Sequence, residues 1–279
     1  MEDLRARYGD PMIRSQCHQL AHVIGREAKY LYPSVAEAFS HGDSFCWSGY
    51  YHGIMEAIVA DAPREELPRM LDTFCVEIPG KAQFSFDYYN CVHGIGHGLM
   101  GIHQNELPAV LAACDDLTGG WEEDSCWSGA FMENIIADEI NHTAKYLNQD
   151  PYYPCNAVDA KYRDTCYRMQ TSRMLTLVGS DFQKVFALCR EVEDAYRNTC
   201  YQSLGRDASG KQVSDVVQTR AVCLLGQDQR EQSNCVIGAV KDFISYYHSD
   251  KEAYELCSTL PDTLQSVCNS TAENYYRLF

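Results

Sequence analysis

The sequence predicts an all-α protein built as a solenoid-like stack of two-helix repeats. Its 279 residues include 14 cysteines, and most of them fall into pairs that recur along the chain. The second cysteines of successive pairs lie 33 to 45 residues apart, which is the period of a two-helix repeat. Between the cysteines, apolar residues recur at three and four positions rather than at two, and this periodicity indicates helices.

The cysteine spacing also predicts a disulfide framework. The chain has an even number of cysteines and no C-x2-C pair, which favours disulfides over zinc-ribbon or redox motifs. A disulfide that closes a loop of about a dozen residues contributes roughly 3 kcal/mol. Members of five pairs lie 11 or 12 positions apart, those of a sixth lie 16 apart, and Cys17 pairs with Cys46 by elimination. The expected pairs are Cys17–Cys46, Cys75–Cys91, Cys114–Cys126, Cys155–Cys166, Cys189–Cys200, Cys223–Cys235 and Cys257–Cys268.

Each pair is expected to join the end of one helix to the start of the next. The first cysteine closes an apolar helical pattern, as in KVFALC, where Phe182, Val185, Phe186 and Cys189 lie at i, i+3, i+4 and i+7. The second cysteine opens another pattern, as in CVIGAVKDFISYY from residue 235. No flexible linker interrupts the series. We therefore expect a single elongated domain over 1–279, with a histidine-rich functional half (1–140) and a disulfide-stapled repeat half (141–279).

This organisation resembles that of the cysteine-rich relatives of tetratricopeptide repeat proteins, which stack disulfide-linked helical hairpins. The resemblance covers about residues 70 to 279 and consists of the repeat period and one cysteine pair per repeat. It implies a helical-repeat architecture, and no functional residue is carried over from it.

Charge and composition narrow the class of protein. A net charge of −16 argues against a nucleic-acid partner, because phosphates would be repelled. No run of about 18 apolar residues is present, so no transmembrane segment is expected. Disulfides persist in oxidising compartments, which indicates an extracytoplasmic protein: secreted, periplasmic or a membrane-anchored ectodomain. The chain opens MEDLRARYGD, so we expect a signal peptide or anchor to be absent from this sequence.

The histidines are concentrated in the first repeats. Seven of the nine precede residue 104, and two pairs, His18 with His22 and His93 with His97, have the four-residue spacing that places both rings on one helix face. His52 and His97 each lie six residues after a cysteine. Because equivalent positions of stacked repeats become neighbours, we expect these side chains to share a surface.

This pattern predicts a transition-metal site. The expected ligands are first His52, His93 and His97, and then His18, His22 and Glu56. Imidazole and carboxylate donors suit zinc, copper or iron. Asp43, Glu56 or Glu133 could supply carboxylates that orient the ligating rings. With an open coordination position, such a site would make the protein a metalloenzyme.

Other interpretations of the same residues stay open. The histidines could be hydrogen-bonded packing residues, or they could transfer protons, with Glu56 orienting His52 and with Glu56 and His41 as the candidate catalytic groups. His41 could equally be a cap residue, and His103 is expected to point away from the site. Gly53 and Gly98 could serve helix packing or clear space for a ligand. The alternative function is a non-enzymatic scaffold whose concave face binds a peptide or protein.

Overall fold

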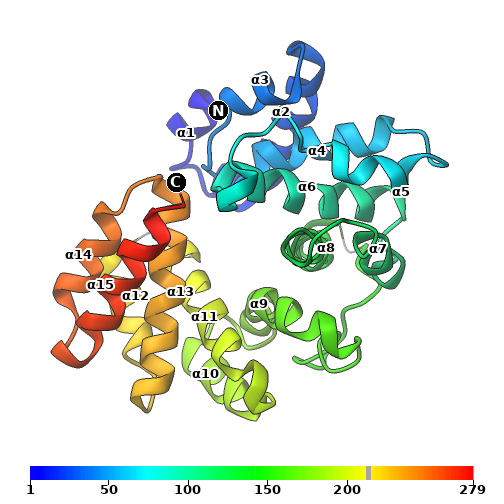
Figure 1. The fold of residues 1–279 in the computed structure, drawn as a ribbon. Coiled ribbons are helices and arrows are strands. Elements are labelled where there is room, and N and C mark those ends of the chain that lie inside the picture. The colour runs from blue at the N-terminus through cyan, green and yellow to red at the C-terminus, as the bar shows by residue number, and fades with distance from the viewer. Residues whose placement is uncertain (142, 212–214, 279) are drawn as a thin grey trace. The chain divides into compact units, whose positions relative to one another are not determined.

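The computed structural model describes residues 1–141, 143–211 and 215–278. Every regular element in these residues is a helix, which confirms the all-α prediction (Figure 1). The helices, in order along the chain, are α1 (Glu2–Ala6), α2 (Pro11–Leu31), α3 (Val35–Ser40), α4 (Gly49–Asp61), α5 (Leu67–Met70), the 3-10 turns η1 (Leu71–Thr73) and η2 (Lys81–Gln83), α6 (Phe86–Ile102), α7 (Leu107–Cys114), α8 (Gly120–Asn141), α9 (Ala160–Leu177), α10 (Phe182–Glu191), α11 (Asp194–Lys211), α12 (Val216–Cys223), α13 (Gln229–Tyr247), α14 (Lys251–Thr259) and α15 (Asp262–Tyr276).

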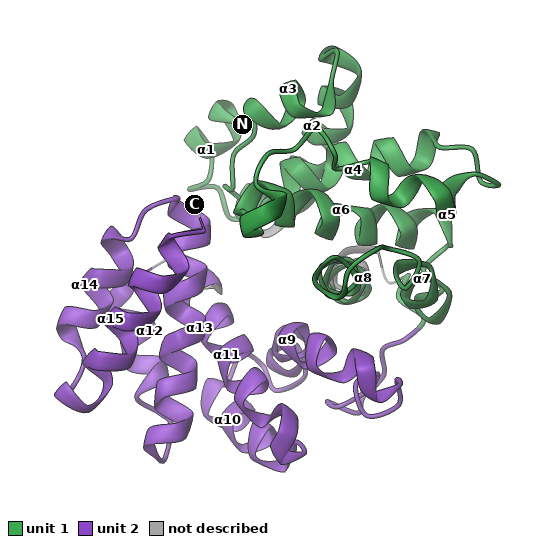
Figure 2. Cartoon of the chain, in the orientation of Figure 1, with its two compact units in different colours: residues 1–145 green, residues 146–279 purple. Residues whose placement is uncertain are grey.

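The chain divides into two compact units, 1–145 and 146–279 (Figure 2). This division falls five residues beyond the boundary at residue 140 expected from the sequence. Each unit has its own buried apolar residues, for example Ile54 and Leu99 in the first and Phe186 and Phe243 in the second. The description of the whole chain as one elongated domain stays a prediction.

Long and short helices alternate within each unit. In the first unit, α2, α4, α6 and α8 pack one against the next, and in the second unit α9, α11, α13 and α15 do the same. The short helices lie between them in sequence. This is the two-helix repeat that the cysteine period predicts, and it places equivalent positions of successive long helices side by side.

Polar side chains fix where several helices begin. Asp10 accepts a hydrogen bond from the backbone N–H of Met12 at the start of α2, and Pro11 follows it as the first helical residue. Ser85 caps α6, and Asp181 caps α10 through the N–H of Lys184. These residues satisfy N–H groups that have no partner inside the helix.

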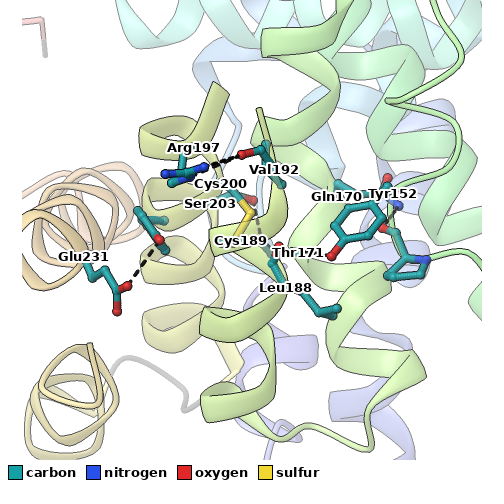
Figure 3. Close-up of a disulfide and its surroundings, with 12 residues drawn as sticks. Tyr152, Gln170, Thr171, Leu188, Cys189, Val192, Arg197, Cys200, Ser203 and Glu231 are labelled. Carbon is teal, nitrogen blue, oxygen red and sulfur yellow. Dashed lines mark hydrogen bonds between the residues drawn. A yellow bond between two sulfur atoms is a disulfide. The ribbon is translucent and has the colours of Figure 1, made fainter. Parts of the chain in front are cut away.

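The seven disulfides occur in the pairs that the spacing predicts. Cys189 near the end of α10 bonds to Cys200 on α11, and beside this bond Arg197 donates to the carbonyl of Val192, which closes the turn between the two helices (Figure 3). The expectation that the second cysteine opens a helix is wrong in detail. Helices α8, α9, α11 and α13 begin six residues earlier, because their first turns are polar and lack the apolar periodicity that marks a helix.

Glycines bring the long helices of the first unit unusually close together. A Cβ atom added to Gly53 on α4 would lie 2.1 Å from the carbonyl oxygen of His22 on α2. One added to Gly129 on α8 would lie 2.0 Å from the carbonyl oxygen of His93 on α6. Only glycine permits backbones to approach this closely. The close packing accounts for Gly53 without a ligand, and it draws the histidine-bearing segments of adjacent helices together.

Candidate metal centre

Five imidazole rings from three successive helices meet inside the first unit. His18 and His22 come from α2, His52 from α4, and His93 and His97 from α6. Centroids of the contacting rings lie between 4.4 and 6.3 Å apart. All five side chains are buried; the most accessible, His18, is only 6 % exposed. The ligand atoms of the described residues form three groups, His18–His22–His52, His52–His93–His97 and His22–Glu56–His97, and within each group they lie within 4.8 Å of one another.

The first group, which we call triad 1, contains His18, His22 and His52. The Nε2 atoms of His18 and His22 lie 2.9 Å apart. Nδ1 of His18 lies 2.7 Å from the carbonyl oxygen of Cys46, and Nδ1 of His22 lies 2.6 Å from Oε1 of Glu56. A carbonyl or carboxylate oxygen only accepts hydrogen bonds, so both Nδ1 atoms carry the proton. In the neutral form of either ring, this tautomer leaves a lone pair on Nε2.

The second group, triad 2, contains His52, His93 and His97. Nε2 of His93 and Nε2 of His97 lie 3.2 Å apart, and Nδ1 of His97 donates to Oε2 of Glu133 at 2.8 Å. Nδ1 of His93 lies 3.1 Å from the hydroxyl of Tyr89, which also contacts the Ser128 hydroxyl at 3.2 Å. Three of the four paired histidines thus donate through Nδ1 to a fixed oxygen acceptor, an arrangement typical of metal-ligating histidines.

His52 belongs to both triads and differs from the other four rings. Its Nδ1 atom is buried and has no hydrogen-bond partner. Its ring stacks on His97 with centroids 4.4 Å apart, and it lies 5.4 Å from the centroids of both His18 and His22. A buried polar nitrogen without a partner is costly in an apolar interior. This orphaned nitrogen is therefore available to a ligand.

The pKa values of groups in the cluster favour the binding of a cation. Burial, reinforced by the neighbouring histidines, holds the pKa of His18 and that of His52 well below the usual value, so both rings are neutral near pH 7. Burial alone would raise the pKa of Glu56. The charge of His22 and hydrogen bonds from His22 and Arg26 outweigh burial and lower this pKa to about 2. A lasting carboxylate charge thus lies behind triad 1.

The structure assigns different partners to several candidates than the sequence predicted. Glu56 contacts His22 and Arg26 rather than orienting His52, because one turn of α4 carries it toward α2. Glu133 does face a histidine. Asp43 instead pairs with Arg5, 38 residues away in sequence. The repeat pattern does not predict this pairing of Arg5 with Asp43.

Two histidines considered from the sequence lie outside the cluster. His41 caps the end of α3 and stacks on Tyr32 with centroids 4.4 Å apart. His103 caps the end of α6 and lines a cavity of about 220 Å³ with Arg64 and Leu67. Tyr89 and Met132 contact His93 and were not predicted from the sequence. The four-residue spacing of Tyr89 and His93 on one helix is the signal that could have found the first.

The second unit replaces the histidines with a different polar network. Ser172 and Arg206 lie six residues after a repeat cysteine, as His52 and His97 do in the first unit. Asp207 accepts hydrogen bonds from Thr171 at 2.7 Å and from Ser172 at 2.9 Å. At these positions, hydroxyl, carboxylate and guanidinium groups form hydrogen bonds with one another. The histidine cluster is thus a property of the first unit.

The fold and the site together define a disulfide-rich, all-α protein with buried histidine clusters that could hold a metal ion. Seven disulfides indicate an oxidising compartment, and among the described helices none has the length and apolar character needed to cross a membrane. No protein-family model, curated protein or solved structure matches this chain.

Proposed function

We propose that this protein binds a transition-metal ion in the histidine cluster of its first unit and acts outside the cytoplasm as a secreted, periplasmic or membrane-anchored protein. The ligands are imidazole nitrogens of the two triads. Glu56 and Glu133 act from behind the rings: each accepts the Nδ1 proton of one ligand and orients its Nε2 atom. Of the two roles expected of Glu56, ligand and orienting carboxylate, its contact with Nδ1 of His22 favours the second.

The observation that carries the proposal is the 2.9 Å separation of the His18 and His22 Nε2 atoms. In their neutral form both rings carry the proton on Nδ1, so two lone pairs then face each other across this distance. Such a contact needs a cation between the nitrogens. Two nitrogens that each lie about 2.0–2.1 Å from one ion are themselves roughly 3 Å apart. The measured separation agrees with a shared metal ligand.

A proton on His22 is the competing occupant of that position. An imidazolium would donate through Nε2 to His18 and through Nδ1 to Glu56, and would satisfy both contacts. A proton on His22, however, leaves Nδ1 of His52 without a partner. A metal ion accounts for the convergence of all five imidazoles, including the third ring of each triad.

The donor set favours some metals over others. Neutral imidazole suits zinc, copper and iron, whereas calcium and magnesium prefer oxygen ligands. When bound, the ion supplies Lewis acidity at a site enclosed by protein. Catalytic activity and the alternative of a peptide- or protein-binding scaffold stay predictions.

Metal loading of the purified protein tests the proposal. The chain is stripped with a chelator, incubated separately with zinc, copper and ferrous iron, desalted and measured by elemental analysis. We expect at least one tightly held ion per chain for one or more metals, and a loss of affinity in His18→Ala/His22→Ala. The control His41→Ala/His103→Ala removes two histidines outside the cluster and should bind as the unaltered chain does. A chain that stays empty with all three metals would refute metal binding.

An isosteric substitution of Glu56 tests whether this residue orients the His22 ring without disturbing the fold. Glu56→Gln keeps the size of the side chain but removes the charge that accepts the His22 proton. We expect metal affinity to fall about 10- to 100-fold, as is typical when an outer contact of a ligand is lost. Glu27→Gln on α2, whose side chain is exposed, is the matched control. Equal affinity in both variants would contradict the role given to Glu56.

A further inference from the structure

The second triad carries a more specific inference, which rests on the proposed metal-binding function. We infer that triad 2 is a separate copper subsite in which the thioether of Met132 is a ligand together with His93 and His97. His52 completes it and is shared with triad 1. The cluster then holds two ions, and the one in triad 2 has a sulfur atom in its coordination sphere.

The geometry around His93 points to Met132. Nε2 of His93 lies 3.2 Å from Nε2 of His97 and 3.3 Å from Sδ of Met132 on α8. Nε2 of His93 thus has a donor atom from α6 and one from α8 at separations typical of ligands of one ion, roughly 3 Å. Methionine often packs its sulfur against the edge of an aromatic ring about 5 Å away. Here the sulfur instead contacts the nitrogen that would ligate the ion.

The rings of the two triads are oriented by different contacts, although the donor atoms of His22, Glu56 and His97 also lie within 4.8 Å of one another. The rings of triad 1 are oriented by the Cys46 carbonyl and by Glu56, and those of triad 2 by Tyr89 and Glu133. The paired nitrogens of each triad come from a single helix, α2 or α6, and only His52 is common to both. A neutral imidazole has one lone pair and one N–H, so His52 serves both ions only when its ring proton is released to solvent as the second ion binds.

The donor types favour copper in triad 2. Thioether sulfur is a soft donor that selects Cu(I), whereas zinc sites use thiolate, imidazole and carboxylate. No free thiol competes, because all fourteen cysteines are in disulfides. A sulfur atom bound to the metal must therefore come from a methionine. Among the described residues, Met132 is the methionine whose sulfur lies within hydrogen-bond distance of a nitrogen of the histidine cluster.

X-ray absorption of the copper-loaded full chain tests the assignment. The stripped protein is loaded with Cu(I) under ascorbate, desalted, and measured for copper per chain and for the scattering neighbours of copper. We expect two copper ions per chain and a sulfur neighbour. The sulfur signal should disappear in Met132→Leu, a change of similar volume, and persist in Met100→Leu, which alters another buried methionine of the same unit.

A second variant tests whether the subsites are separate. His93→Ala/His97→Ala should retain one copper ion per chain and lose the sulfur neighbour, with its helical circular dichroism unchanged. A single copper in the unaltered chain, the absence of sulfur, or a sulfur signal that survives Met132→Leu would overturn the inference and leave metal binding by the cluster intact. Failure to bind copper, zinc or iron at all would overturn the proposed function itself.

Discussion

At the scale of single residues, the chemistry of a carboxylate depends on which hydrogen-bond donor the neighbouring helix places against it. Three acidic residues lie seven positions after a repeat cysteine: Glu133, Asp207 and Asp242. Glu133 accepts a hydrogen bond from Nδ1 of His97, and Asp207 accepts hydrogen bonds from hydroxyls. Asp242 accepts a hydrogen bond from the Ser209 hydroxyl at 2.5 Å. Equivalent positions in the repeat thus serve different chemistry because the preceding helix presents different partners.

Asp242 is expected to make stability depend on pH. Burial raises its pKa to about 7, and the opposing effects of Ser209 and Arg206 only partly offset burial and the charge of Asp207. In the unfolded chain an aspartate titrates near pH 3.9. Between about pH 4 and 7 the folded state therefore keeps a proton that the unfolded state has released. In this window stability falls as pH rises, by up to about 1.4 kcal/mol per pH unit.

Replacing this carboxyl by an amide should remove that pH dependence. Asp242→Asn cannot ionise, so we expect it to stabilise the protein relative to the unaltered chain at pH 8 and to have a much smaller effect at pH 4.5. Urea denaturation at both pH values measures the difference. Glu255→Gln, at an exposed position of α14, should show no such change with pH. A stabilisation by Asp242→Asn that is equal at both pH values would argue against a protonated Asp242.

At the scale of elements, the close approach of the long helices depends on glycine. A Cβ at Gly53 would meet the His22 carbonyl oxygen at 2.1 Å, whereas one at Gly101, an exposed position near the end of α6, would meet nothing within 4 Å. Substitutions at these two positions therefore distinguish the effect of a glycine on helix packing from its effect on helix propensity. Alanine is the better helix former in both cases.

Alanine substitution should have opposite effects at these two glycines. Gly53→Ala forces α2 and α4 apart and is expected to cost about 1–3 kcal/mol of unfolding free energy. It should also weaken metal binding, since it displaces His22 relative to His52. Gly101→Ala should stabilise by about 0.5–1 kcal/mol. Thermal denaturation measures both, and a neutral Gly53→Ala would show that the helices have room to separate.

At the scale of the whole molecule, the disulfides respect the division into two units. Three lie within residues 1–145 and four within 146–279, and none joins the units. All five clustered histidines and both orienting glutamates belong to the first unit. Each unit therefore carries its own covalent staples, and the first carries the whole candidate metal centre.

Separate expression of residues 1–145 should preserve the centre. We expect this fragment, produced under oxidising conditions, to fold with three disulfides and to bind the same number of metal ions as the full chain. Residues 146–279, with four disulfides but without the cluster, serve as the comparison and should bind none. Elemental analysis with non-reducing peptide mapping gives both quantities. Loss of metal binding in a correctly oxidised 1–145 would show that the second unit contributes to the site.

The repeat could be predicted from the order of residues alone. Periodic cysteines predicted seven pairs, and helical periodicity predicted the class of fold, because both depend on local spacing along one chain. The sequence also singled out His18, His22, His52, His93 and His97, since equivalent positions in stacked repeats become neighbours. It placed several helix starts too late, at the cysteine, because solvated first turns carry no apolar pattern.

The surroundings of each imidazole could not be predicted in this way, because they depend on how the helices pack. The turn of α4 that places Glu56 against His22, the carbonyl of Cys46 behind His18, and the sulfur of Met132 beside His93 depend on the crossing and register of neighbouring helices. Those are set by side-chain packing and by backbone contact at glycines, which act between residues that are far apart in sequence. A repeat period places histidines in one neighbourhood, but hydrogen-bond directions within a few ångströms determine which nitrogen atoms are free to bind an ion.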